Sequence, residues 1–406
     1  MNYKFPDLNH ISDILPHIEG WDEFRVMEKG WYTVINYMVA FEETFSYDSP
    51  DGSDSYHNMS VRRECRGLIF DTETGHLISR PYHKFFNAGE RDETQLNKID
   101  LTKPHVILEK LDGSMIRPIP TKEGFRLATK AGITDVAMNA EVFISDKWIP
   151  TNELHNSYHT FINKCIQKGT TPIFEWCSRK NRIVIDYPED QLILTAIRYN
   201  DTGNYVSYKV MKNYAFAWGI PVVKAIAGDE TDITKVVEHI RKWDDGEGVV
   251  IRFDDGHMVK IKADDYVLRH KSKDAINQEK NVLQTILDDS VDDLVPLLTP
   301  EDAERVKSFQ NAFWASVTDL CIDMDHLFDM GNKKYPDKKD FAVEYVQKET
   351  LPIYAPIMYG MKNGKGSKQI ILDMIRKSLT TQTKVDENRW LFGGLNWNYS
   401  SIDTMN

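Results

Sequence analysis

The sequence predicts an α+β fold in which a domain of antiparallel sheets is followed by an all-helical C-terminal domain. From about residue 31 to residue 265, short apolar runs of strand length alternate with glycine and proline turns and a few helical segments. Beyond about residue 275, apolar residues recur at helical spacing instead. The 406 residues are enough for two domains with separate cores, and we place them at residues 1–274 and 275–406.

The individual elements follow from the spacing of the apolar residues along the chain. Ile11, Ile14, Leu15 and Ile18 share one helical face and predict a helix within residues 1–20. The predicted strands cover residues 105–109, 172–177, 181–185, 248–252 and 259–262, and the predicted helices cover residues 136–149, 156–168, 303–328, 341–349 and 370–379.

One predicted strand ends in the sequence Lys110-Leu-Asp-Gly-Ser114. The apolar run 105–109 delivers Lys110 to an Asp-Gly turn. A lysine becomes a nucleophile when burial or neighbouring cations lower its pKa from about 10.4. Taken alone, the motif is also typical of a hairpin turn that carries a solvated lysine. The residues around it must therefore decide between these interpretations.

Further charged residues occur in or beside the later predicted strands. Glu175 interrupts an apolar run, Glu247 directly precedes one, and Lys260 and Lys262 share one face of an alternating strand. Taken alone, the two lysines are typical of a solvated strand face. Together the residues suit a nucleoside triphosphate, because cations flank its phosphates and a carboxylate can accept a ribose hydroxyl or hold hydrated magnesium. The order of the pieces therefore indicates a nucleotide site.

These pieces resemble a known superfamily. Four segments resemble the nucleotidyltransferase motifs of ATP-dependent ligases and mRNA capping enzymes. In chain order they match motifs I, III, IV and V: Lys110-Leu-Asp-Gly-Ser114, Phe174-Glu175, Glu247-Gly-Val-Val250 and Lys260-Ile-Lys262. More narrowly, the segments similar to the bacteriophage T4 RNA ligase 1 family are Glu64-Cys-Arg-Gly67, Arg80-Pro81, Lys84-Phe-Phe-Asn87, Asn181-Arg-Ile-Val184 and the run 260–267. The resemblance covers most of residues 30–295. Lys271 departs from it, because the family pattern has a small hydroxyl residue there.

The resemblance implies an ATP-dependent RNA ligase that works in three steps. Lys110 would attack the α-phosphorus of ATP and form lysyl-AMP, the AMP would pass to an RNA 5′-phosphate, and an RNA 3′-hydroxyl would then displace it. Mg²⁺ is the implied metal, with Mn²⁺ as an alternative. The implied catalytic residues are Lys110, Glu247, Lys130 and Tyr266; the nucleotide-binding residues are Tyr37, Arg66, Lys84, Phe86, Glu175, Lys260 and Lys262; the metal-binding residues are Asp292 and Asp112. Phe86 would pack near the adenine, and its ring could stack on the base.

The helical tail separates this family from its relatives. DNA ligases and capping enzymes carry a small five-stranded barrel after the last lysine motif, and such a barrel would show short alternating strands. None is predicted here, so residues 275–406 are expected to provide RNA specificity, with a nicked tRNA anticodon loop as a candidate substrate. Another covalent nucleotidyltransferase, a DNA ligase or capping enzyme, is one alternative, and a non-catalytic RNA-binding protein is the other.

Composition and family together predict the setting in which the protein works. The net charge is −12, yet residues 103–132 hold six Lys or Arg against three acids, which predicts focused contact with an RNA end. No long apolar stretch is present, so no membrane contact is expected, and the four cysteines lack Cys-x-x-Cys spacing. We expect a monomer in the cytoplasm of an infected bacterial host, acting in tRNA or RNA repair alongside a kinase/phosphatase that heals RNA ends.

Overall fold

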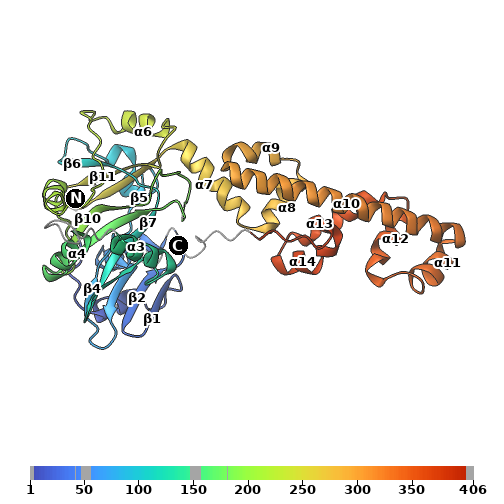
Figure 1. Ribbon diagram of the computed structural model, residues 1–406, viewed down its shortest axis with the longest axis horizontal. Helices are drawn as coiled ribbons and strands as arrows, with labels where there is room; N and C mark the ends of the chain where they lie inside the picture. The colour runs from blue at the N-terminus through green and yellow to red at the C-terminus, as the bar shows by residue number, and fades with distance from the viewer. Residues whose placement is uncertain (1–3, 42, 47–55, 147–156, 181, 399–406) are drawn as a thin grey trace. The chain divides into compact units, whose positions relative to one another are not determined.

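The computed structural model describes residues 4–41, 43–46, 56–146, 157–180 and 182–398 (Figure 1). The chain separates into two compact units, Met1–Val267 and Leu268–Ser401. The first unit contains all the described strands, and the second is helical. The predicted fold class, antiparallel sheets followed by a helical C-terminal region, is confirmed.

Three four-stranded sheets form the framework of the first unit. Their neighbours are antiparallel except for one parallel pair, β12 with β5. From one edge to the other, the first sheet contains β1 (Phe24–Glu28), β2 (Tyr32–Tyr37), β3 (Arg66–Asp71) and β4 (Leu77–Ser79). The second sheet contains β10 (Gln191–Tyr199), β9 (Thr170–Cys177), β7 (Ser114–Thr121) and β8 (Gly124–Ala128). The third sheet contains β5 (Phe86–Asn87), β12 (Met258–Lys262), β11 (Gly248–Phe253) and β6 (His105–Glu109).

Helices cover these sheets through apolar faces. Phe161 of α4 packs in one core with Phe174 of β9, and Ile240 of α6 packs in another with Ile261 of β12. Burying side chains of this size contributes about 1.5–3 kcal/mol each. The helices that begin in this unit are α1 (Leu15–Ile18), α2 (Tyr56–Glu64), α3 (Asp135–Asp146), α4 (Ser157–Gln167), α5 (Tyr208–Phe216), α6 (Ile233–Arg241) and α7 (Asp264–Ile276), which continues into the second unit.

Two predicted elements are wrong. The N-terminal helix is reduced to a 3₁₀ turn, Ile11–Asp13, and the single helical turn α1, because Pro6 and Pro16 interrupt the backbone hydrogen bonding that a longer helix needs. Residues 182–185 are loop rather than strand, and Asn181 lies outside the described residues.

The helical unit is organised around the long helix α10 (Pro300–Lys334). Thr299 caps α10 by accepting a hydrogen bond from the Asp302 amide at 3.1 Å. Phe313 and Met324 of α10 lie in a single core with the helices around it. None of the helices in the described part of the chain is both long and apolar enough to cross a bilayer. The other elements are α8 (Glu279–Leu287), α9 (Val291–Leu294), α11 (Lys338–Asp340), a π-helical turn (Phe341–Val346), α12 (Ala355–Lys362), α13 (Ser367–Ser378) and α14 (Gln382–Glu387).

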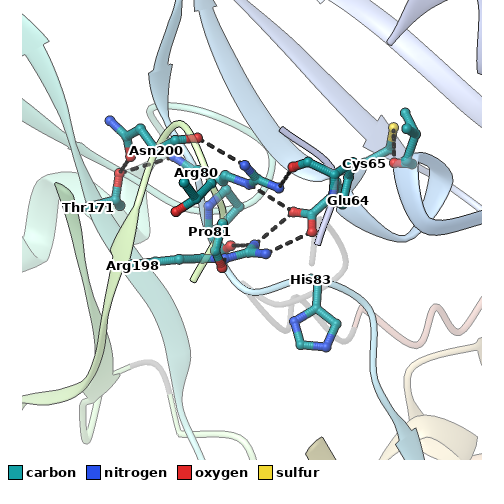
Figure 2. Close-up of polar contacts among 12 residues, drawn as sticks. Glu64, Cys65, Arg80, Pro81, His83, Thr171, Arg198 and Asn200 are labelled. Atoms are coloured by element: carbon teal, nitrogen blue, oxygen red, sulfur yellow. Dashed lines mark hydrogen bonds and ion pairs between the residues drawn. The ribbon is translucent and has the colours of Figure 1, made fainter. Parts of the chain in front are cut away.

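A buried ion network joins distant parts of the first unit (Figure 2). The Glu64 carboxylate accepts hydrogen bonds from Arg198 at 2.7 and 2.8 Å and from Arg80 Nε at 3.1 Å, and all three side chains are at most 1% exposed. Arg80 also donates to the carbonyls of Pro6 and Asn200. Burial alone would raise the pKa of Glu64, but the two guanidinium groups lower it below its ordinary value. The network thereby ties Glu64, which shortly precedes Arg66, to Arg80, which shortly precedes Lys84; Arg66 and Lys84 are two of the predicted nucleotide contacts.

Replacing Glu64 with glutamine is expected to destabilise the protein by about 3–5 kcal/mol, because two buried guanidinium groups lose the counter-charge that they share. Thermal or urea unfolding measures this loss. The exposed pair Lys98–Asp92 offers the control, since Asp92→Asn should cost no more than about 1 kcal/mol. Equal losses in the two variants would contradict the network's importance.

Candidate active site

Lys110 lies where β6, β11 and β12 place three charged side chains together. Its backbone N–H donates to the Gly248 carbonyl at 2.8 Å, which continues the β6–β11 ladder by one residue. The Lys110 Nζ lies 2.6 Å from Glu247 Oε2, and Lys262 Nζ lies 2.9 Å from Glu247 Oε1. Lys110 is 22% exposed and Glu247 4%, so the carboxylate sits beneath the reachable amine. Glu247 is thus held between two lysines.

Backbone geometry explains why Glu247 is followed by glycine. Gly248 has a φ of 137° and pairs with Lys262 on β12, and a Cβ at this position would collide with the Ile261 carbonyl. The glycine therefore lets β12 approach closely enough for Lys262 to reach Glu247. Burial by itself would raise the pKa of Glu247, but the ion pairs with Lys110 and Lys262 lower it.

Glu175 comes from the neighbouring sheet and faces the same group. It pairs with Met115 in the β7–β9 ladder, and a Cβ on Gly113 would lie 3.1 Å from the Glu175 Cγ and 2.5 Å from the Trp176 carbonyl. The Asp-Gly turn after Lys110 therefore packs against β9. Burial raises the pKa of Glu175 to about 7, with Lys110 opposing the shift and Glu247 adding to it.

Asp112 anchors this turn from both of its carboxylate oxygens. Oδ1 accepts a hydrogen bond from the Tyr266 hydroxyl at 2.7 Å, and Oδ2 accepts from the Val184 and Ile185 amides at 2.8 and 2.7 Å. The Asp112 carboxylate thus accepts the amide hydrogen bonds that a neighbouring strand would otherwise accept, which explains why residues 182–185 form a loop. Asp112 is only 3% exposed. Tyr266 is 4% exposed, and burial raises the pKa of its hydroxyl, which stays a donor to Asp112.

A second group of cations surrounds Lys260 on β12. Burial, together with the charges of Lys84, Lys110 and Arg66, lowers the pKa of Lys260 to about 7. The pKa of Tyr37, which burial alone would raise, is lowered by Arg66, Lys84 and Lys130. Burial also lowers the pKa of Lys130. So many cations close together, with few carboxylates among them, match a polyanionic ligand such as a triphosphate.

A family profile described as RNA ligase, of the T4 RNA ligase 1 type, matches residues 64–275, which contain all of the site residues above except Tyr37. The chain belongs to this RNA ligase family. A protein of Thermovibrio ammonificans that carries the provisional name RNA ligase is 28% identical over 305 residues, 73% of this chain and 74% of that protein. RNA ligase 1 of bacteriophage TS2126 is 24% identical over 349 residues, 82% of this chain and 83% of the phage protein.

A second viral relative and a solved structure are also similar to this RNA ligase. A protein of Autographa californica nuclear polyhedrosis virus, provisionally named bifunctional polynucleotide kinase/RNA ligase, is 27% identical over 308 residues, 72% of this chain and 41% of that protein. An archaeal ATP-dependent RNA ligase superposes with a TM-score of 0.43 at 12% identity, covering 66% of this chain and 64% of the other.

The position of Phe86 in the RNA ligase corrects one expectation. Its ring is 1% exposed and belongs to the core of the first sheet, so the ring is not open for stacking on a base. Three cations contact it instead, with Lys84 Nζ at 5.3 Å and Arg63 and Arg91 at 5.1 and 5.0 Å from the ring centre. Phe86 thus supports Lys84 through a cation–π contact.

Three protein donors contact the oxygens of Asp112, namely the Tyr266 hydroxyl and the amides of Val184 and Ile185, and its role as a metal ligand stays a prediction. Asp292 lies in the helical unit, at an exposed position in α9. Among the residues that the structure describes, no cluster of three or more His, Cys, Asp or Glu could hold a metal ion. A hydrated magnesium ion needs no such cluster, since it keeps several waters and binds substrate phosphates.

Sequence reasoning missed one residue of the RNA ligase site, Arg117 on β7. Its guanidinium is 0% exposed and donates to the Thr129 carbonyl at 2.9 Å and to the Gly67 carbonyl. A Cβ on Gly67 would collide with the Lys130 backbone, so these two segments lie close together, and Arg117 joins them through the carbonyls next to Arg66 and Lys130. Burial lowers the pKa of Arg117 to about 9. The available signal was an arginine inside an otherwise apolar strand, which requires buried partners.

Proposed function

We propose that this RNA ligase uses ATP and joins a 5′-phosphate to a 3′-hydroxyl through a covalent AMP on Lys110. The observation that carries the proposal is the 2.6 Å contact between Lys110 Nζ and Glu247, with Lys262 on the other carboxylate oxygen. A reachable amine, a proton acceptor and a cation for the phosphates thus occupy one site. Lysine attack on phosphorus needs these three functions.

In the first step, the Lys110 amine forms a bond to the α-phosphorus while the bond to pyrophosphate breaks. The amine must lose a proton, and Glu247 lies within hydrogen-bonding distance to accept it. Lys262 lowers the pKa of Glu247 in the free protein. When ATP phosphates engage Lys262, this effect weakens and Glu247 becomes a better base. Lys260 and Lys262 then stabilise the charge on the departing pyrophosphate.

The remaining steps use the same site with RNA as the substrate. The RNA 5′-phosphate would take AMP from Lys110 and regenerate the amine, and the 3′-hydroxyl of a second end would then displace AMP. Arg66, Lys84 and Lys130 would hold phosphate oxygens, and Glu175 would accept a ribose hydroxyl, with Tyr37 among them. Tyr266 would act through Asp112. Magnesium, or manganese, would bind phosphates and water and neutralise charge at the α-phosphorus.

The family supports a proposal for the biological setting. We place the protein in tRNA or RNA repair, acting as a monomer in the cytoplasm of an infected bacterium. The helical unit would recognise the RNA, which could be a nicked anticodon loop. The baculovirus relative, whose name combines a polynucleotide kinase with an RNA ligase, supports a partnership with an enzyme that heals RNA ends.

Intact-mass measurement after incubation with magnesium and either ATP or GTP tests the proposal. We expect one AMP per protein from ATP, located on the peptide that contains Lys110, and no GMP from GTP. A GMP adduct would indicate a capping enzyme instead. The adduct should then disappear when a 5′-phosphorylated RNA is added and should persist with a 5′-phosphorylated DNA duplex nick. Failure to form any adduct would refute the covalent mechanism.

ATP affinity is expected to fall as pH rises through 7, because Lys260, whose pKa is about 7, is charged below this value and neutral above it. The loss should reach up to about tenfold per pH unit. Calorimetric titration with a non-hydrolysable ATP analogue between pH 6 and 9 measures it. Lys260→Met should bind more weakly at pH 6 and show a flatter profile. Since ionisation of the analogue affects both proteins alike, parallel profiles would contradict the prediction.

A further inference from the structure

The helical unit separates its charges along the chain. Residues 284–330 contain eleven acidic and two basic residues, whereas residues 331–368 contain eight lysines and four acidic residues. The second segment, called the basic end here, comprises the end of α10, then α11, the π-helical turn, α12 and the start of α13. A separation this large gives one end of the unit a positive potential and the rest a negative one.

Side-chain contacts bring the two halves of the basic end together. Lys362 Nζ donates to Asn332 Oδ1 at 2.6 Å and to the Pro336 carbonyl at 2.8 Å. Lys338 Nζ lies 3.3 Å from Asn363 Oδ1. The turn that follows α10 therefore lies against the turn between α12 and α13, and Figure 1 shows α11 and α12 beside the same end of α10.

Three of the four acidic residues in the basic end are already engaged. Glu349 pairs with Lys334 at 2.8 Å and Glu344 with Lys348 at 2.7 Å. Asp337 caps α11 by accepting from the Lys339 and Asp340 amides, and these backbone bonds lower its pKa. The carboxylates thus neutralise two of the lysines or support the backbone.

The remaining lysines form an exposed cationic surface. Lys333, Lys339 and Lys365 are exposed, and in the described part of the chain no carboxylate pairs with any of them. Lys365 stands between Gly364 and Gly366, and a Cβ on either glycine would meet nothing within 4 Å. A bulky polyanion can therefore approach this turn closely. Lys338 and Lys368 add two more exposed charges to the surface.

We propose that the basic end binds the phosphate backbone of the RNA substrate away from the ends that are joined. The proposal rests on the RNA ligase function above and assigns the RNA contact to one surface of the helical unit. RNA is the partner that the observations favour, because exposed lysines without a paired carboxylate gather on this surface, and cations of this kind bind phosphates. The acidic segment 284–330 repels RNA, so the bound strand is confined to the basic end.

The test compares two triple variants with the same change in charge. Lys333→Glu, Lys339→Glu and Lys365→Glu together remove the proposed contacts. Lys307→Glu, Lys377→Glu and Lys384→Glu together form the control, because these lysines are also exposed in the helical unit but lie outside the basic end. RNA affinity is measured for the full-length protein over a range of salt concentrations, using a 5′-phosphorylated RNA of at least 20 nucleotides.

The basic-end variant should bind the RNA at least tenfold more weakly than the control at low salt. The slope of log affinity against log salt should fall by about 2, since each phosphate contact on a single strand contributes about 0.7. AMP-adduct formation in the absence of RNA should stay within about twofold of the unmodified protein in both variants, which separates this proposal from the covalent mechanism. Similar RNA affinities and slopes for the two variants would overturn the proposal. It would also be overturned if the basic-end variant kept its affinity for RNA but lost affinity for an acidic protein surface.

Discussion

Lys110→Met is expected to abolish the AMP adduct to below detection, because methionine keeps an unbranched apolar side chain and removes the attacking amine. ATP binding should survive, since Lys260 and Lys262 remain to hold the phosphates. Intact-mass analysis after incubation with ATP and magnesium measures the first effect, and calorimetric titration with ATP measures the second. A variant that binds ATP but carries no adduct would place Lys110 in the chemical step.

The same substitution at an exposed lysine provides the control. Lys98 pairs with Asp92 on the surface, and Lys98→Met should form the adduct at the normal rate. The Lys110 variant should also fail to activate the RNA end, yet it should seal an RNA that already carries a 5′-adenylate, because that last step needs no lysine adduct. An undiminished adduct in Lys110→Met would refute the assignment of the nucleophile.

Glu247→Gln is expected to slow adduct formation by about 10²–10⁴-fold, the usual contribution of a positioned proton acceptor. Glutamine keeps the shape of the side chain and can still contact Lys110 and Lys262, but it cannot take the proton. Single-turnover measurement of AMP transfer to the protein gives the rate. In the variant the rate should rise with pH more steeply than in the unmodified protein, because solvent must remove the proton.

Glu238→Gln is the matched control for this variant, since Glu238 is exposed on α6 and lies nine residues before Glu247. Its rate of adduct formation should stay within about twofold of normal. Unfolding curves for both variants separate a catalytic loss from a loss of fold. A near-normal rate in Glu247→Gln would show that the carboxylate orients Lys110 without accepting its proton.

The sequence predicted the fold class and the strands β6, β9, β11 and β12 because their apolar patterns are local. Lys110 and Glu247 could be found in the same way, since each stands at the end of an apolar run. The register that brings Lys262 onto Glu247 could not, because it depends on β11 pairing with β6 on one side and β12 on the other.

The errors also have physical causes. Residues 182–185 have the apolar character of a strand, but the carboxylate of Asp112, about seventy positions earlier, accepts two of their amide hydrogen bonds. Burial of the Phe86 ring depends on packing against Phe45 and on three cations from elsewhere in the chain. Arg117 was missed because its partners are main-chain carbonyls, which carry no sequence signature. At each of these positions, contacts with residues far away in the sequence determined the structure, and the local pattern therefore gave a wrong prediction or none.

The fastening of Asp112 restricts how the nucleophile can travel during a reaction cycle. Both carboxylate oxygens of Asp112 are hydrogen-bonded and Gly113 packs against β9, so the turn is held in place. The amine therefore moves by rotation about the side-chain bonds of Lys110. Such a side chain reaches a few ångströms, so an adenylate attached to it would stay close to Glu247 and Lys262. The RNA end must therefore be delivered to the adenylate, and turnover should depend on how well the rest of the chain steers that delivery.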